Sequence, residues 1–261
     1  MIDFKNKFVV ITGASSGIGE AIAEEFARRG ARILLTGRNE SRLRNAAAKC
    51  MAAGAASADT AVVDMASEES IHAFAAGLEE TPDCLVLNAG ISQRSLALET
   101  GADVDRKVME TNFFGPTSLV HALADKIKGA KHISIGVTSS ISGLFGFPLR
   151  SAYCASKHAL IGWFEALQTE NPNIRVTILI PGRINTPISL SALHADGTAH
   201  GEMDPGQQNG MPADRCGKIA VNAIARGKRR KLIGGVELLM VHIKKWLPGL
   251  FWILAGKVSS K

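Results

Sequence analysis

Short apolar runs that alternate with longer amphipathic segments constrain this chain more than any other feature. The runs are rich in β-branched residues, and several, such as Cys84-Leu85-Val86-Leu87, are apolar at every position. Strands of this kind are buried on both faces of a parallel sheet. Candidate strands lie at 7–12, 31–36, 59–64, 83–88, 131–139, 174–180 and 231–233. Candidate helices lie at 17–29, 40–53, 67–78, 103–128, 151–170, 213–227 and 236–254.

This alternation predicts a fold of the α/β class. Seven strands joined by crossover helices predict a Rossmann-type, doubly wound parallel sheet with right-handed crossovers. Gly30, Gly54 and Gly129 stand where helices are expected to end. No linker-like change of composition divides the chain, so residues 1–261 are expected to form a single domain.

One stretch departs from the alternation. Residues 183–212 contain four glycines and three prolines between an expected strand and an expected helix. A connection of this length within one domain is usually functional. It follows the carboxyl end of a strand, where parallel sheets bind ligands, so 183–212 is expected to be a substrate loop.

Charge and cysteine content exclude several classes of protein. Residues 226–261 hold nine Lys or Arg and one acid, whereas the other 225 residues hold 21 basic and 23 acidic side chains. A general nucleic-acid binder would carry basic charge over its body. The four cysteines form no C-x-x-C pair, and the seven histidines show no H-x-x-x-H spacing, so we expect no disulfide scaffold and no metal site.

The start of the chain reads directly as a strand, Lys7 to Thr12, which leaves no room for a secretory signal. We therefore expect a reducing, cytoplasmic location. The apolar segment at 236–261 mixes tryptophans with lysines and is too interrupted to span a bilayer. It is expected to pack on the substrate cleft or a partner subunit, and peripheral contact with a membrane surface is the alternative.

A glycine turn joins the first strand to the first helix, with the sequence Thr12-Gly13-Ala14-Ser15-Ser16-Gly17-Ile18-Gly19. Glycine permits close approach of the backbone, and a helix N-terminus attracts anions. The turn predicts a pyrophosphate site, with a simple tight turn as the alternative. Where an NAD site would carry a carboxylate at the end of the second strand, this chain has Arg38. An arginine there favours the 2′-phosphate of NADP, and a solvated surface arginine is the alternative.

Polar residues follow two more of the strands that end at this edge. Asp64 ends the third expected strand, where an adenosine would lie, and helix capping is an alternative or additional role for it. Asn88, Ala89 and Gly90 end the fourth.

Tyr153 and Lys157 stand four residues apart at the start of an expected helix and so share one face. Tyr153 is the only tyrosine of the chain. A nearby ammonium lowers the pKa of a phenol, so this pair is a candidate general acid and base. Ser139 and Ser140 end the fifth strand, where a hydroxyl could polarise a carbonyl or serve only the turn. Asn112 lies within a long expected helix despite its low helix propensity, which indicates a function, a kink or a buried, satisfied amide.

Together these residues resemble the short-chain dehydrogenase/reductase family. The likeness runs along the whole chain, through T-G-A-S-S-G-I-G at 12–19, N-A-G at 88–90, Asn112, Ser140, Y-x-x-x-K at 153–157 and the segment Pro181 to Thr186. The family's usual gap of 13 residues before the tyrosine selects Ser140 over Ser139. Leu87 departs from the family pattern, because an asparagine that helps to brace the sheet is usual there.

The resemblance implies a role for each matching residue. Tyr153 would be the general acid and base, Lys157 would lower its pKa and bind the nicotinamide ribose, Ser140 would polarise the substrate carbonyl, and Asn112 would hold a water. The residues implied to bind NADP(H) are Gly13, Ser15, Ser16, Gly17, Ile18, Gly19, Arg38, Asp64, Asn88, Ala89, Gly90, Tyr153, Lys157, Pro181, Gly182, Ile184 and Thr186.

The implied activity is NADPH-dependent reduction of a carbonyl by a homodimer or homotetramer built partly from the helices that carry Asn112 and Tyr153. Segments such as His194-Ala195-Asp196-Gly197 and Leu247-Pro248-Gly249-Leu250-Phe251 are similar to the member-seven branch of the family. That branch is tied to membranes and to lipid-like carbonyls, which implies an apolar ketone or aldehyde substrate. A catalytically silent dinucleotide sensor or scaffold is the alternative, although it would have no need of all four catalytic residues. A Ser–Lys hydrolase is disfavoured, because no G-x-S-x-G motif is present.

Overall fold

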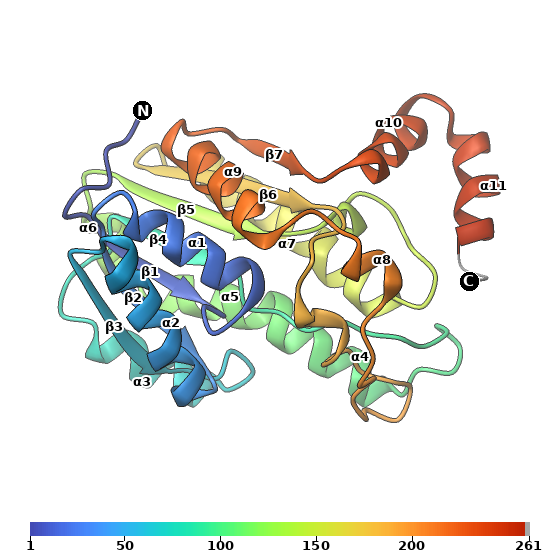
Figure 1. Cartoon of the computed structure of the whole chain (residues 1–261), viewed down its shortest axis with the longest axis horizontal. Helices are drawn as coiled ribbons and strands as arrows, with labels where there is room; N and C mark the ends of the chain where they lie inside the picture. The colour runs from blue at the N-terminus through green and yellow to red at the C-terminus, as the bar shows by residue number, and fades with distance from the viewer. Residues whose placement is uncertain (259–261) are drawn as a thin grey trace.

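A computed structural model describes residues 1–258 and contains one seven-stranded sheet (Figure 1). All strands pair in parallel, in the order β3-β2-β1-β4-β5-β6-β7. The strands are β1 Phe8–Thr12, β2 Arg32–Gly37, β3 Ser57–Val62, β4 Cys84–Leu87, β5 Ile133–Thr138, β6 Ile174–Pro181 and β7 Arg230–Ile233. The doubly wound α/β prediction is confirmed. The strand order reverses between β1 and β4, which is where such sheets bind ligands.

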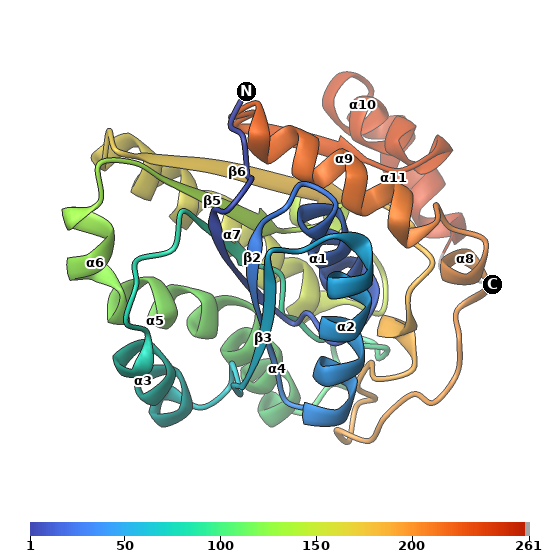
Figure 2. The ribbon, with the colours of Figure 1, turned by 60° about the vertical axis from the view of Figure 1, so that its left-hand side comes forward.

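Helices cover both faces of the sheet (Figure 2). The α-helices are α1 Gly17–Ala27, α2 Glu40–Ala53, α3 Glu68–Gly77, α4 Ala102–Met109, α5 Gly115–Ala122, α6 Ala124–Gly129, α7 Ser151–Glu170, α8 Pro205–Gln208, α9 Ala213–Ala225, α10 Leu239–Trp246 and α11 Pro248–Val258. A π-helix, η1 Glu110–Phe114, and the 3₁₀ turns η2 Ile141–Gly143, η3 Pro187–Ser189 and η4 Val236–Leu238 complete the described elements. Buried side chains of α1, α2 and α9 pack on one face of the sheet, and those of α3, α5 and α7 pack on the other.

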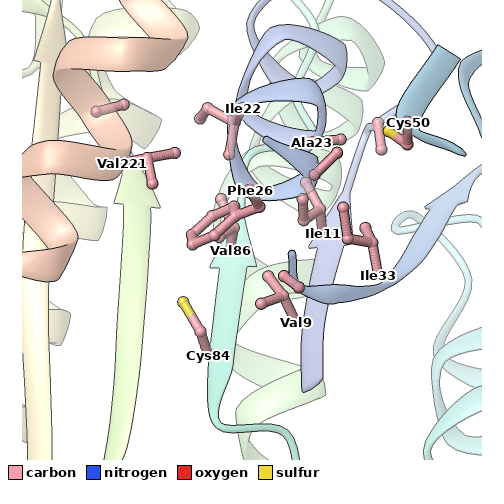
Figure 3. Close-up of a cluster of buried hydrophobic side chains, with 14 of the residues drawn as sticks. Val9, Ile11, Ile22, Ala23, Phe26, Ile33, Cys50, Cys84, Val86 and Val221 are labelled. Carbon is pink, nitrogen blue, oxygen red and sulfur yellow. The ribbon is translucent and has the colours of Figure 1, made fainter. Parts of the chain in front are cut away.

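The apolar core on the sheet face that α1, α2 and α9 cover fixes the position of α1. Phe26 of α1 lies beside Val86 of β4, and Ile22 of α1 lies on the side that faces Val221 of α9, in the same cluster as Ile11 of β1 (Figure 3). All five side chains are fully buried. Because these contacts fix α1 directly over β1, the glycine turn between them has a fixed position at the sheet edge.

The single helix expected at 103–128 is wrong. The chain forms α4, then η1, then α5 and α6. The π-helical turn contains Asn112 and is followed by Gly115-Pro116. A Cβ on Gly115 would lie 2.0 Å from the carbonyl oxygen of Met65, so the turn passes close to another backbone where only glycine is accommodated.

The stretch 183–212 has local structure of its own. It contains η3 and α8, and single bridges pair Ile184 with Met211 and Leu193 with both Gln93 and Ala199. The loop is therefore held to the segment after β4, at the sheet edge where the conserved turns of this architecture bind ligands.

The C-terminal segment bends at Leu247-Pro248 into α10 and α11, rather than forming one helix over 236–254 (Figure 1). Phe251 is fully buried, with its ring centroid 4.9 Å from that of Phe145 in the loop after Ser140. This face therefore packs on the chain's own loop after Ser140. Trp246 and Trp252 on other faces are exposed by 70% and 58%. Among residues 1–258, no helix is long and apolar enough to cross a bilayer.

Candidate active site

The glycine turn has the geometry of an anion cradle. Gly13 and Gly17 adopt φ values of 63° and 61°, which favour glycine, and a Cβ on Gly19 would lie 2.2 Å from the carbonyl oxygen of Gly13. The N-cap of α1, Ser16, makes no side-chain capping bond, although other helices are capped in this way. The turn therefore presents backbone N–H groups at a positive helix end, which fits a dinucleotide pyrophosphate.

Asn88 and Thr12 brace this turn from below. The Asn88 side-chain amide donates to the carbonyl oxygens of Thr12, at 3.3 Å, and Gly13, at 3.2 Å. In return, the Thr12 hydroxyl accepts from the backbone N–H groups of Asn88 and Ala89. Leu87, where the family usually has asparagine, is buried among apolar side chains. The brace is therefore built by Thr12 and Asn88 in this chain, and the Asn88 amide serves the turn.

Arg38 is exposed directly after β2, beside the glycine turn. A Cβ on the preceding Gly37 would lie 3.5 Å from the Ser15 hydroxyl, so the end of β2 and the turn are in contact. The next residue, Asn39, caps α2 by accepting from the N–H of Arg42. The Arg38 side chain is thus exposed at the place expected for a ribose phosphate.

Asp64 lies two residues beyond the end of β3, which spans Ser57–Val62 rather than 59–64. The capping alternative for Asp64 is wrong, because Ser67 is the N-cap of α3 and accepts from the N–H of Ser70. Asp64 instead accepts from the N–H of Ala66 within its own turn. It remains at the same edge of the sheet as Asn88.

Tyr153 and Lys157 lie together on the first turns of α7. The Lys157 ammonium is 5.7 Å from the centroid of the Tyr153 ring and donates to the carbonyl oxygen of Thr138 at 2.8 Å. Lys157 is 3% exposed, whereas Tyr153 is half-buried. Helix α7 begins and ends where the sequence predicts. The i, i+4 pair is thus formed and points toward the end of β5.

The pKa of Tyr153 differs from the sequence expectation. Burial raises the pKa of this phenol, and hydrogen bonding with Ser140 and the charges of Arg150 and Arg94 only partly oppose the rise. Lys157 does not supply the lowering that was expected of it. Burial in turn lowers the pKa of Lys157 to about 8. Tyr153 is therefore a neutral phenol at pH 7, which is the form that donates a proton.

The two serines after β5 have different partners. Ser139 donates to the carbonyl oxygen of Lys157 at 2.9 Å and so fastens the strand end to α7. Ser140 accepts from the N–H of Ser142 and donates to the carbonyl oxygen of Pro181 at a long 3.4 Å. The Ser140 hydroxyl also acts on Tyr153, because it opposes the rise of the phenol's pKa. These contacts give Ser139 a structural role and leave Ser140 as the hydroxyl beside the phenol.

Asn112 is fully buried in the π-helical turn, and of the three alternatives the buried, satisfied amide is confirmed. Its amide donates to the carbonyl oxygen of Ile91 and to the Ser156 hydroxyl, and its Oδ1 accepts from the N–H of Ile91. A Cβ on Gly90 would lie 3.1 Å from Asn112 Oδ1 and 3.4 Å from Lys157 Nζ. Asn112, Gly90 and Lys157 are thus brought together, and a larger residue at position 90 would crowd the two side chains.

The segment after β6 reaches across to the glycine turn. Pro181 ends β6, and Gly182 donates its N–H to Ile233 of β7. Ile184 and Thr186 are buried, and a Cβ on Gly17 would lie 3.2 Å from Thr186 Cγ2. A dinucleotide held by the turn would therefore lie against this segment. The residues expected at the site thus gather along one edge of the sheet.

Three charged residues at this site were missed by the sequence analysis. Asp204 of the 183–212 loop accepts hydrogen bonds from Arg94 and Arg150. Arg150 immediately precedes α7. No spacing rule connects positions 94, 150 and 204, so only the folded chain brings them together. Within residues 1–258, no group of three or more His, Cys, Asp or Glu side chains is placed to hold a metal ion.

The comparison with known proteins agrees with this geometry. The family model described as short chain dehydrogenase matches residues 7–196. This chain belongs to the short-chain dehydrogenase/reductase family. It is 38% identical to dehydrogenase/reductase SDR family member 7B of Mus musculus, over 98% of this chain and 82% of that protein. It therefore falls in the member-seven branch of these oxidoreductases.

Two solved structures have the same fold and carry dinucleotides. A short chain dehydrogenase/reductase of Burkholderia phymatum in complex with NAD has a TM-score of 0.82 at 25% identity, over 96% of each chain. An alcohol dehydrogenase of Thermococcus sibiricus complexed with 5-hydroxy-NADP has a TM-score of 0.75 at 26% identity, over 88% of this chain and 97% of that one. The fold thus serves both nucleotides, and a nicotinamide dinucleotide is the cofactor that the family implies.

Proposed function

We propose that this protein is an NADPH-dependent carbonyl reductase in which Tyr153 donates the proton. The observation that carries the proposal is a half-buried phenol with the Lys157 ammonium 5.7 Å from its ring centroid, one helical turn away, and with Ser140 opposing the rise of its pKa. When bound, the reduced nicotinamide supplies a hydride to the carbonyl carbon. Tyr153 protonates the carbonyl oxygen, so that a ketone or aldehyde becomes an alcohol.

The neighbours of Tyr153 orient the reacting groups. The Ser140 hydroxyl would hydrogen-bond the carbonyl oxygen and polarise it. Lys157, fixed by the carbonyl of Thr138, would hydrogen-bond the nicotinamide ribose. Asn112 would hold a water between Lys157 and solvent, which is supported by its position beside Gly90. The nicotinamide side of the cofactor site would be formed by Pro181, Gly182, Ile184 and Thr186. The rest of the dinucleotide would contact Ser15, Ile18, Asp64 and Ala89.

We infer that residues 1–261 act as one NADP-binding domain and that 183–212 is its substrate loop. The substrate class we propose is an apolar or lipid-like carbonyl. Exposed leucines on three segments support it: Leu96 is 51% exposed, Leu98 fully, Leu149 37% and Leu190 39%. Exposed apolar side chains of this kind favour apolar ligands.

The experiment that tests this function is NADPH oxidation by the purified protein across a carbonyl panel that runs from small aldehydes to steroid and long-chain ketones. The proposal expects turnover, with the highest kcat/KM for the apolar members. A catalytically silent sensor or scaffold, the alternative function, would bind NADPH and oxidise none of them.

Arg38→Ala is expected to change the cofactor preference. The guanidinium would pair with the 2′-phosphate, and a charge-assisted bond of this kind corresponds to a ~10- to 100-fold effect on the KM for NADPH. The KM for NADH should stay nearly constant, because NADH lacks that phosphate. Steady-state kinetics with both cofactors measures the ratio. An unchanged ratio would mean that Arg38 is only a surface residue.

We further propose a homodimer or homotetramer in the cytoplasm, with peripheral membrane contact through 236–261. Exposed Trp246 and Trp252 beside Lys244 and Lys245 support the contact, because aromatic and basic side chains together favour an anionic bilayer surface. When anionic vesicles are pelleted, the wild type should sediment with them, and a Trp246→Ser/Trp252→Ser variant should stay in the supernatant. Equal sedimentation of the two proteins would contradict the proposed membrane contact. Light scattering of the purified protein would measure the size of the oligomer.

A further inference from the structure

We propose that Asp204 is a positioning residue that fastens the 183–212 loop to the segment after β4 and to the start of α7, and thereby sets the substrate cleft and the surroundings of Tyr153. The expected effect of Asp204 on catalysis rests on the proposed function. The attachment of the loop by Asp204 does not depend on that function.

The contacts of Asp204 come from three parts of the chain. Arg94 donates its Nε to Asp204 Oδ1 at 3.3 Å and to Oδ2 at 3.0 Å, and its Nη2 also bonds Oδ2. Arg150 donates Nη2 to the same Oδ2 at 3.2 Å. His200 Nε2 lies 3.7 Å from Oδ1. One carboxylate of the loop thus receives two arginines from outside the loop.

The three side chains of this ion-pair cluster are largely buried, so the two arginines depend on Asp204 for a partner charge. The side chains of Arg94, Asp204 and Arg150 are exposed by only 8%, 21% and 26%. Arg94 also donates Nη1 to the Ser92 hydroxyl and to the carbonyl of Gln93, so its guanidinium has partners on every side. Removal of Asp204 would leave two partly buried cations facing each other without a counter-charge.

The carboxylate itself is held in the ionised form. Burial works to raise the pKa of Asp204, but the hydrogen bond from Arg94 and the charges of Arg94, Arg150 and His200 outweigh it, so the pKa is lowered. His200 in turn contacts His194 at 3.4 Å, and His194 contacts the carbonyl of Arg94 at 3.3 Å. Asp204 therefore carries its charge throughout the neutral pH range.

The cluster is connected to the reacting phenol by a short path. Arg94 exchanges backbone contacts with the loop, donating its N–H to Leu193. The adjacent Gln93 accepts from the N–H of Ala152 at 2.9 Å and donates to the Ser151 hydroxyl, both in the first turn of α7. Arg150 begins that turn and, with Arg94, opposes the rise of the Tyr153 pKa. Displacement of Asp204 would therefore act on the cleft and on Tyr153 through residues that do not themselves react.

The test compares Asp204→Asn with Asp196→Asn in the holoenzyme. Asp196 is a matched control, because it lies in the same loop, is exposed, and accepts only from Thr198 within the loop. We expect D204N to raise the KM for the carbonyl about tenfold or more, since small displacements have large kinetic effects, with a smaller change in kcat. It should also speed Glu-C cleavage after the exposed Glu202, as followed by mass spectrometry.

A pH profile distinguishes positioning from a merely structural role. Without the Asp204 charge, Arg94 and Arg150 act unopposed on the phenol, so the alkaline limb of kcat/KM should move to lower pH. Arg150→Gln should move it to higher pH. Asp204→Glu, which keeps the charge, should restore the profile at least in part. If D204N does not fold, Arg150→Gln provides the test instead, because it removes only one of the hydrogen bonds to Asp204.

Each result decides the proposal. Faster cleavage, a raised KM and a shifted limb in D204N, with D196N unchanged, would support it. Equal cleavage of D204N and D196N would overturn the docking role. Faster cleavage of D204N with KM and pH profile unchanged would overturn the positioning role. A wild-type protein that reduces no carbonyl would refute the proposed function instead, and the cleavage comparison would still report on the loop.

Discussion

Tyr153→Phe should abolish carbonyl reduction and leave cofactor binding intact. The phenylalanine keeps the ring, which packs beside Ile91, Val104, Val108 and Leu193, and removes only the hydroxyl. A general acid contributes on the order of 10²- to 10⁴-fold to the rate, and the chain has no second tyrosine to replace it. Single-turnover and steady-state NADPH oxidation measure the loss.

Cofactor binding is the control for this variant. The glycine turn and Arg38 are remote from the hydroxyl, so the quenching and blue shift of NADPH fluorescence should match the wild type. A Phe variant that still reduces carbonyls would mean that another group supplies the proton. Ser140 is the hydroxyl that stands beside the phenol, so Ser140→Ala in the same background would then identify the source.

Lys157→Met should lower catalysis and at the same time change how stability depends on pH. The variant removes the ammonium that lies 5.7 Å from the Tyr153 ring. Loss of such a preorganised charge lowers kcat/KM by about 10²-fold or more. The wild-type ammonium is buried, and burial lowers its pKa from 10.5 to about 8.

The sign of the stability effect follows from proton binding. Between pH 8 and 10.5 the unfolded chain keeps the Lys157 proton while the folded protein has lost it. Stability of the wild type from this group therefore rises with pH across that window, by about 3 kcal/mol in total. Lys157→Met has no such proton, so the free energy of unfolding of the variant should fall relative to wild type over the same window.

Denaturant unfolding of both proteins at pH 7 and pH 10 measures this difference. Lys218→Met is the matched control, because Lys218 is exposed on α9 and should show no such dependence. A constant difference between Lys157→Met and wild type would contradict a buried, charged Lys157. Activity and stability are thus in conflict at Lys157, because the charge that serves catalysis destabilises the folded chain at neutral pH.

Local sequence patterns predicted all seven strands and most helices, because these depend on features that neighbouring residues carry. Helices α2 and α7 have the expected bounds, and Gly54 ends α2 in the left-handed conformation. The long helix at 103–128 was wrong because its periodicity is nearly continuous. The structure interrupts it with the π-helical turn at Glu110–Phe114 and again between α5 and α6. The turn lies next to Gly115, which approaches Met65 closely through a tertiary contact.

The candidate site divides in the same way. The glycine turn and the Tyr153–Lys157 pair were found from local patterns, and the resemblance to the short-chain dehydrogenase/reductase family then selected Asn112 and Ser140. Burial decided the protonation of the phenol in the opposite direction to the local expectation, since the charge of Lys157 does not offset desolvation.

The sequence by itself thus determined the order of strands and helices, the sheet edge that carries the site and the identity of the phenol and the ammonium, because each is encoded in short-range patterns. Only the tertiary structure decided the remainder. It brought Arg94, Arg150 and Asp204 together from positions more than 50 residues apart, and it set the two pKa values by burial. The physical reason is that desolvation and long-range ion pairing depend on which segments pack together, and no single segment carries that information.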